Sequence, residues 1–571
     1  MVQDEVVGWI DVCYTEERPP ADEGPFLKEE RKLIKTIAER LERRIFHERL
    51  KGVFEGSKKV PRGESQYAAI IDLLKRTDQK LLTRIARKML YFLSWSGVEE
   101  ARELIVKLSP AAVLDRQEAL DPNRPLQRQR PTDLNGMSDE VFGLAVKYFS
   151  EKEVLQSIQK WIMEDRSNFL MKVLEDPGTT LPEIAASIER FHHLASHGME
   201  LDLAREKAFR VSLIRRLLSD DPNFVHVAKD FIEINDFYVL LQRVIYPSSS
   251  HGRLGGKASG LILASQVLRK SSQTNEFLRN IKTPKTWYLT SDTILYFISH
   301  NDLDEIVEQK YEDIERVRQE YPYVVHVFKN SPLPPEIMNG LSVALDDFGE
   351  SPLIVRSSSL LEDRPGTSFA GKYKSLFIAN QGTKRERLAA LADAITEVYA
   401  STFSPDALEY RAEHGMVDFH EEMGILIQEV VGKKVGHYFV PAFAGVIFAN
   451  NDFRWSPRIR REDGLLRLVP GLGTRAVDRL SDDYPVLVSP GQPNLRVNVT
   501  LEEKIRYSPR KIDVINQKTN SFETMDVSQL LAQFGNEYPA IRHVVSILRS
   551  DRLEVPGGLG IESATDPLIV T

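Results

Sequence analysis

PLIVRSSSLLEDRPGTSFAGKYKSL, at residues 352–376, is the stretch that decides the expected fold of the C-terminal half of this chain. An apolar strand at its start delivers Arg356, which is followed by three serines at 357–359 and then by Gly371 and Ser375. An always-charged guanidinium fork beside several hydroxyl and amide donors suits the oxygens of a triphosphate. The stretch therefore predicts a phosphate-binding site where a strand ends. The alternative is structural, with Arg356 paired to an acidic residue of the following turn.

A second stretch lies about a hundred residues earlier and reads LGGKASGLILASQVL at residues 254–268. Gly255 and Gly256 allow close approach of the backbone to a ligand, and Lys257 adds a positive charge. The apolar periodicity that follows predicts a helix, whose N-terminus favours anions. The spacing differs from GxxxxGK[ST], so this is not a P-loop, and a glycine-rich turn before a helix also occurs without any ligand.

Composition sets the outer limits of the interpretation. The chain has 571 residues, of which 42% are apolar and 28% charged, with a formal net charge of -8. This length predicts several globular domains, and the negative charge argues against nucleic acid or an anionic membrane as a partner. Cys13 is the only cysteine, which excludes an intramolecular disulfide and fits a reducing compartment. We therefore expect a cytoplasmic protein.

Hydrophobic periodicity divides the chain into four parts. A strand at Val6–Tyr14 and a helix over residues 26–50 open the chain, and residues 51–245 have helical spacing throughout. Residues 246–550 alternate strand-like and helical segments, and residues 551–571 form a tail with little pattern. The predicted class is an α+β multidomain protein with a strand-helix fragment, an all-helical middle domain and a C-terminal α/β domain.

The C-terminal blocks resemble a known family when they are taken in order. They are GGKASG, VRSSSLLEDRPGTSFAGKYKSL, AITEVYASTFSPDALEYRAEHG, ILIQEVV, FAGVIFAN and PGLG. Their order is similar to that in the ATP-binding domain of phosphoenolpyruvate synthases, pyruvate phosphate dikinases and rifampicin phosphotransferases. The resemblance implies a two-lobed, ATP-grasp-like domain at residues 246–550. The short N-terminal segment, residues 1–50, resembles the end of a GAF-type sensory domain with its linker helix, although an ordinary strand and amphipathic helix remain the alternative.

The family resemblance also implies roles for particular residues, with ATP and Mg²⁺ as cofactors. Lys257 and Arg356 would hold the nucleotide phosphates and act in catalysis, and Gly371 and Ser375 would belong to the loop that covers them. The adenine would lie along a hinge made of Gln428, Glu429 and Val430.

The sequence departs from the family at the expected metal site. Where the family commonly reads GLGE, with a metal-binding glutamate, this chain has Thr474, and Pro485 replaces a downstream polar ligand. Asp478 and Asp482 are our candidate magnesium ligands from a shifted position, and solvated loop charge is the alternative.

Two functions follow from the resemblance and its departures. In the first, the chain is an ATP-dependent phosphotransferase component that phosphorylates a histidine on a separate phosphocarrier domain or protein, because its sequence contains no phosphohistidine block of the GG…Ser-His-Ala type. In the second, it is a catalytically impaired nucleotide-sensing or scaffolding protein. The sequence identifies neither the phosphoryl acceptor, nor the partner of the helical domain, nor the oligomeric state.

Overall fold

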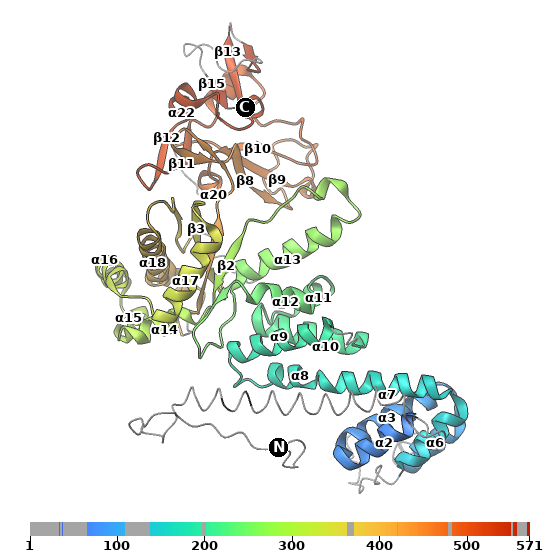
Figure 1. Ribbon diagram of the computed structural model, residues 1–571. Coiled ribbons are helices and arrows are strands. Elements are labelled where there is room, and N and C mark those ends of the chain that lie inside the picture. The colour runs from blue at the N-terminus through green and yellow to red at the C-terminus, as the bar shows by residue number, and fades with distance from the viewer. Residues whose placement is uncertain are drawn as a thin grey trace. The chain divides into compact units, whose positions relative to one another are not determined.

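The computed structural model describes Ile34, Ile37 and residues 66–108, 137–196, 201–361, 371–418, 421–477, 482–549, 552–556 and 568–570 (Figure 1). The strand and helix predicted in residues 1–50 therefore lie outside the described residues, apart from two helical positions. The described residues fall into two compact units. The first lies within Met1–Phe169 and His193–Leu201, and the second within Leu170–His192 and Asp202–Thr571.

The first unit is helical in its described part. Its helices are α2 (Gln66–Thr77), α3 (Gln79–Trp95), α4 (Glu99–Leu108), α6 (Ser138–Tyr148) and α7 (Glu151–Arg166). Helix α3 begins where the Asp78 carboxylate accepts a hydrogen bond of 2.9 Å from the backbone N–H of Leu81. Leu82, Ile85 and Met89 recur at helical spacing and are buried in the core of this unit.

The second unit begins with helices and continues as a mixed α/β structure. Its helices, the first of which starts two residues before the unit, are α8 (Asn168–Glu175), α9 (Leu181–Ser196), α10 (Leu203–Leu217), α11 (Pro222–Phe231), α12 (Ile234–Leu241), α13 (Gly256–Ser271), α14 (Thr293–His300), α15 (Asp304–Glu308), α16 (Ile314–Asn330), α17 (Pro335–Phe348), α18 (Lys384–Ala400), α19 (Pro405–Glu413), α20 (Thr474–Val477), α21 (Leu501–Arg506), α22 (Val527–Phe534) and α23 (Ile541–Val544). Among the described residues up to 241 the regular elements are helices, and β1 lies within the last residues of the range predicted to be helical.

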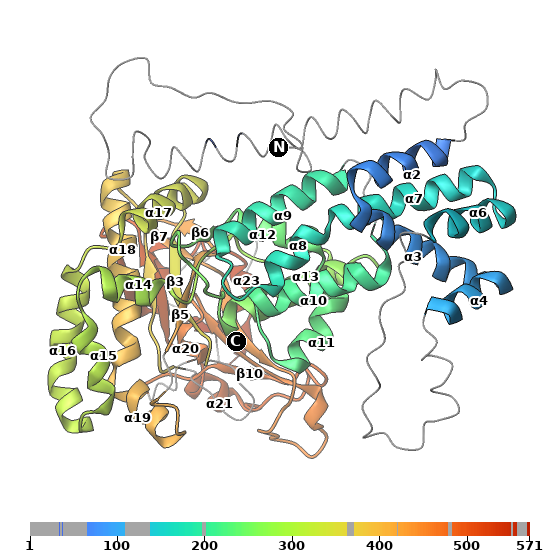
Figure 2. The same cartoon turned by 90° about the horizontal axis from the view of Figure 1, so that it is seen from below.

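A five-stranded sheet organises the first half of the α/β structure. Its order is β1 (Val244–Ile245), β2 (Thr286–Leu289), β5 (Met423–Glu429), β3 (Leu353–Ser359) and β4 (Ser375–Ile378). Only β1 and β2 are parallel, and the other neighbours are antiparallel. Helices α17 and α18 lie on one side of the sheet and α13 on the other, as both views show (Figures 1 and 2).

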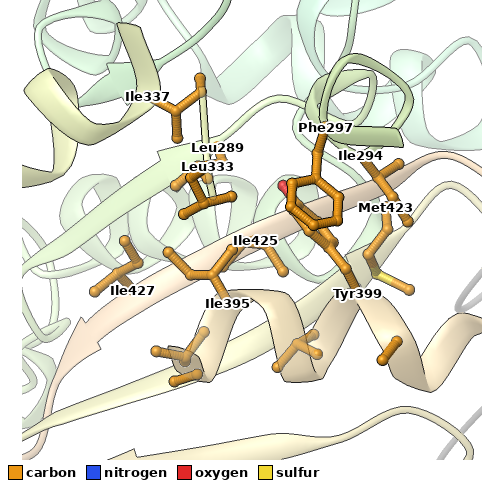
Figure 3. Packing of buried hydrophobic residues seen from close by; sticks show 14 of the residues in the cluster. Leu289, Ile294, Phe297, Leu333, Ile337, Ile395, Tyr399, Met423, Ile425 and Ile427 are labelled. Atoms are coloured by element: carbon orange, nitrogen blue, oxygen red, sulfur yellow. The ribbon is translucent and has the colours of Figure 1, made fainter. Parts of the chain in front are cut away.

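The main hydrophobic core lies between this sheet and helices α14, α16, α17 and α18. Alternate strand residues such as Leu289, Ile425 and Ile427 meet Phe297 and Tyr399 from the helices (Figure 3). Because side chains alternate along a strand, the residues between them face the opposite side of the sheet, toward α13. This alternation decides which side chains are available for a site.

Three smaller sheets form the second half. The first has the order β10 (Val486–Val488), β9 (Leu465–Pro470) and β8 (Phe443–Phe448). The second has the order β12 (Ser521–Asp526), β11 (Lys511–Asn516), β7 (Tyr438–Val440) and β6 (Lys433–Val435). The third has the order β14 (Arg552–Glu554), β13 (Val545–Arg549) and β15 (Leu568–Val570). A buried cluster of Ala379, Val430, Leu472 and Ile515 connects the five-stranded sheet to β11. The mixed α and β composition that the sequence predicts is confirmed. In the described part of the chain, none of the helices combines the length and apolar character that a bilayer crossing requires.

Candidate functional site

The strand register places Arg356, Gln428 and Thr286 on the sheet face that the main core leaves uncovered. Gln428 pairs with Thr286 on one side and with Ile354 on the other, and Arg356 lies two residues further along β3. The guanidinium of Arg356 donates to Oε1 of Gln428 at 3.4 Å, and Nε2 of Gln428 donates to the Thr286 hydroxyl at 3.0 Å. The three side chains therefore form a hydrogen-bonded row across β3, β5 and β2.

Lys257 reaches the same strand from the start of α13. Its ammonium donates to the hydroxyl of Ser357 at 2.9 Å, and the N–H of Ala258 donates to the hydroxyl of Ser358 at 3.1 Å. Gly255 has φ +84°, and a Cβ built on it would lie 1.8 Å from the carbonyl oxygen of Ser358. The close approach predicted for this glycine is thus an approach to strand β3, and it places the Lys257 ammonium at Ser357, the residue that follows Arg356 in the strand.

Ser375 lies beside Arg356, and Gly371 precedes Ser375 by four residues. Ser375 is directly opposite Arg356 in the β3–β4 pair and is exposed. Gly371 has φ +77° and open space around its Cβ position. The residues between the two segments, 362–370, lie outside the described residues, and with them the acidic partners Glu362 and Asp363 of the structural alternative for Arg356.

The three residues of the predicted hinge make contacts with different parts of the structure. Gln428 faces Arg356, whereas the carboxylate of Glu429 accepts a hydrogen bond of 3.1 Å from the Ser351 hydroxyl. The side chain of Val430 is buried in the cluster that connects the sheets, and its N–H donates to the carbonyl of Pro352 at 2.8 Å. Among these three residues, only Gln428 has its side chain in the row with Arg356.

A buried ion pair holds the end of β3. The Ser359 hydroxyl donates to Glu421, and Glu421 lies 3.5 Å from the guanidinium of Arg411. Both charged side chains are nearly inaccessible, at 3% and 5% exposure. Ser359 also accepts a hydrogen bond of 2.8 Å from the N–H of Leu361, the last described residue before the loop. The pair therefore fixes the point where the chain leaves the strand.

The segment that departs from the family forms a second charged cluster. Thr474, at the start of α20, donates its hydroxyl proton to Asp513 on β11. Arg475 is 6% exposed and lies 2.7 Å from Asp482, 3.6 Å from Asp483 and 3.7 Å from Asp513. An internal guanidinium thus neutralises the carboxylates at the position where the sequence predicts a metal.

Asp482 therefore has cations at both of its oxygens. Oδ2 accepts from the Lys511 ammonium at 2.6 Å, and Oδ1 accepts from Arg475 at 2.7 Å. The hydrogen bond from Lys511 and the charge of Arg475 lower the pKa of Asp482. Asp478 lies outside the described residues, and within them no three His, Cys, Asp or Glu side chains gather as a metal site would require. The described carboxylates do not fit Mg²⁺ in this arrangement.

Thr286 and Asp513 are among the residues of these clusters that the sequence did not predict. Nothing in the sequence marks Thr286 as a functional residue, because threonine is common in β-strands. Asp513 could have been noticed in the sequence, because it interrupts the apolar run of β11. In the structure it is 3% exposed. A carboxylate inside a buried strand requires a partner, and Thr474, Thr524 and Arg475 provide it.

The second unit places this chain among proteins with an AMP/ATP-binding domain. The family described as "Pyruvate phosphate dikinase, AMP/ATP-binding domain" matches residues 251–536, which is half of the chain, and the chain belongs to this family. The match does not include residues 1–50, so their GAF-type resemblance stays a prediction.

Curated proteins similar to this chain include a rifampicin phosphotransferase of Streptomyces sp, 28% identical over 191 residues, or 33% of this chain and 20% of the relative. The phosphoenolpyruvate synthase of Aquifex aeolicus is 23% identical over 183 residues, or 29% of this chain and 21% of the relative. That of Escherichia coli (strain K12) is 24% identical over 205 residues, or 33% of this chain and 24% of the relative. The similarity to these proteins thus spans only 20% to 24% of their lengths.

Proposed function

We propose that the chain binds ATP at the site formed by Lys257, Arg356 and Gln428, as the nucleotide-binding component of a phosphotransferase. The observation that carries this proposal is the convergence of α13, β3 and β5. These elements bring the Lys257 ammonium to Ser357 and the Arg356 guanidinium to the amide of Gln428, at adjacent positions of β3. Clustered cations with adjacent hydroxyl donors match the charge and the hydrogen-bonding capacity of phosphate oxygens.

Each residue has a distinct part in the proposed site. Lys257 acts as a point charge on the phosphates, and Arg356 offers its planar fork to two oxygens at once. Gln428 orients Arg356 and begins the edge along which the adenine lies. Ser375 and Gly371 belong to the loop that closes over the phosphates and excludes water. The five-stranded sheet and the sheets of β8–β12 then correspond to the two lobes of an ATP-grasp-like domain.

The phosphoryl acceptor is proposed to be a histidine on a separate domain or partner. The support is the similarity to proteins named phosphoenolpyruvate synthase and rifampicin phosphotransferase. Phosphoryl transfer depends mainly on positioning and on neutralisation of charge, and Lys257 and Arg356 supply both.

Mg²⁺ has no assigned step in this proposal. The family implies the ion, but both oxygens of Asp482 are paired with cations, and Thr474 uses its hydroxyl to bind Asp513. A metal ion at this position would have to displace Arg475 from its carboxylates. The same cluster favours the second candidate function, a sensor that binds ATP without turning it over.

Chromatographic measurement of ATP and its products distinguishes the phosphotransferase from the sensor. The chain is incubated with ATP in the presence of a histidine-bearing phosphocarrier domain or of the same domain with the histidine replaced by alanine. Loss of ATP only with the intact histidine, abolished by Lys257→Ala, is expected for the phosphotransferase. ATP-dependent thermal stabilisation without any loss of ATP would instead identify a sensor, and the absence of both would contradict the proposal.

A further inference from the structure

A cavity separate from the proposed nucleotide site lies in the second half of the α/β structure. Its volume is about 650 Å³, within the range of pockets that hold small organic ligands. Strand β10, the segment that leads into α21, helix α21 and the sheet of β13–β15 line it. Lys257, Arg356 and Gln428 are not among the described residues that line the cavity. Three residues that do line it, Ser546, Leu553 and Val570, lie beyond the family match, so the cavity is not confined to the matched domain.

The walls of this cavity are mostly apolar and aromatic. Val486 and Leu487 of β10 form one side, and Val497 belongs to the segment before α21. The rings of Tyr484 and Tyr507 pack edge to face, with centroids 5.2 Å apart and planes at 89°. Such a wall suits a flat apolar group, and the tyrosine hydroxyls offer polar contacts at its rim.

The charged residues among the described lining of the cavity are all basic. Arg496 and Lys504 line it, and its described lining contains no carboxylate. Within the described part of the chain, neither side chain makes an ion pair or a hydrogen bond, although most basic residues near the other sites are paired. Two exposed cations that have no counter-ion among the described residues attract an anion to the pocket.

We propose that this cavity binds a small molecule with an aromatic or otherwise apolar body and one anionic group, such as a carboxylate, sulfonate or phosphate. The body lies against the valine, leucine and tyrosine walls, and the anionic group lies between Arg496 and Lys504. The site includes Pro485, the position where the family has a polar ligand, but none of Lys257, Arg356 and Gln428, and it goes beyond the proposed function.

Fluorescence titration with 8-anilinonaphthalene-1-sulfonate tests this, because that probe has an aromatic body and one sulfonate. N-phenyl-1-naphthylamine, which has the same body without the charge, is the matched neutral probe. The anionic probe should bind saturably, and Arg496→Gln with Lys504→Gln should weaken its binding roughly tenfold or more. The same double substitution should leave the neutral probe nearly unaffected.

Matched variants complete the test. Arg458→Gln with Lys518→Gln removes two exposed charges that do not line the cavity, and it should leave both probes unchanged. Val497→Trp fills the cavity without a change in charge and should weaken both probes. Equal loss of the anionic probe in the two double variants would overturn the proposal. So would its displacement by ATP or its weakening by Lys257→Ala, since either result would place the probe in the nucleotide site.

Discussion

Arg475 shows how a single side chain can change the chemistry of a site. Its buried guanidinium lies among three carboxylates, and Lys511 adds a second cation to Asp482. A buried charge is tolerated only with partners, so these acidic groups and Arg475 require one another. The departure from GLGE to GLGT is thus accompanied by an internal arrangement in which two cations offset most of the charge of three carboxylates.

Thr474→Glu tests whether that arrangement excludes the family's carboxylate. The glutamate would lose the hydrogen bond to Asp513 and place a second negative charge beside it, in a site where Asp513 is 3% exposed. We expect the free energy of unfolding, measured by urea denaturation, to fall by about 1–3 kcal/mol. Thr474→Val, which removes only the hydroxyl, should cost less. A stable Thr474→Glu variant whose ATP affinity rises with Mg²⁺ would contradict this account.

The pairs of Asp482 predict a dependence of stability on pH. Because Lys511 and Arg475 lower its pKa in the folded protein, Asp482 stabilises the fold above its unfolded pKa. This contribution is lost as the pH falls below the ordinary range of an aspartate and through the lowered folded pKa. The stability difference between the wild type and Asp482→Asn should therefore shrink on acidification. A difference that stays constant over this range would show that the carboxylate is not ionically paired.

At the scale of elements, the start of α13 depends on Gly255. Gly255→Ala would place a methyl group 1.8 Å from the carbonyl of Ser358, at a φ of +84° that disfavours alanine. We expect a loss of at least about 2 kcal/mol in the free energy of unfolding and a weaker ATP affinity, because Lys257 would move away from Ser357.

Gly260→Ala in the same helix is the matched control. Its Cβ position has no atom within 4 Å, and the residue is exposed. Alanine should there stabilise the helix by about 0.5–1 kcal/mol and leave ATP affinity unchanged. Thermal denaturation measures the stability of both variants, and calorimetry measures their ATP affinity. Equal effects of the two substitutions would show that the close contact with β3 is not what requires glycine at position 255.

The same elements show what local sequence pattern can and cannot predict. The apolar run before Arg356 indicated a strand where β3 occurs, and although β3 continues to Ser359, the position of Arg356 on this strand followed from that run. The insertion of β5 between β2 and β3 did not, because that order depends on pairing between segments far apart in the chain. For the same reason the contact of Gln428 with Thr286 was missed. The tail, which showed little pattern, contains β15, which is paired with β13.

At the scale of the whole molecule, the proposed ATP site belongs entirely to the second compact unit. Lys257, Arg356, Gln428 and Ser375 all come from its five-stranded sheet and the adjoining α13. Nucleotide affinity should therefore be set by residues of that unit. The aligned relatives are about four to five times longer than the matched segments.

Calorimetric titration of ATP into the full chain tests the central claim most directly. It is performed on the wild type, Lys257→Ala, Arg356→Ala and the control Arg385→Ala, whose exposed side chain lies on α18, on the far side of the sheet. Each titration is run with Mg²⁺ and again with EDTA. We predict saturable binding that persists in EDTA, that weakens roughly tenfold or more in each site variant and that is unchanged in the control. Binding that Lys257→Ala and Arg356→Ala leave intact, or no binding by the wild type, would contradict the proposed site.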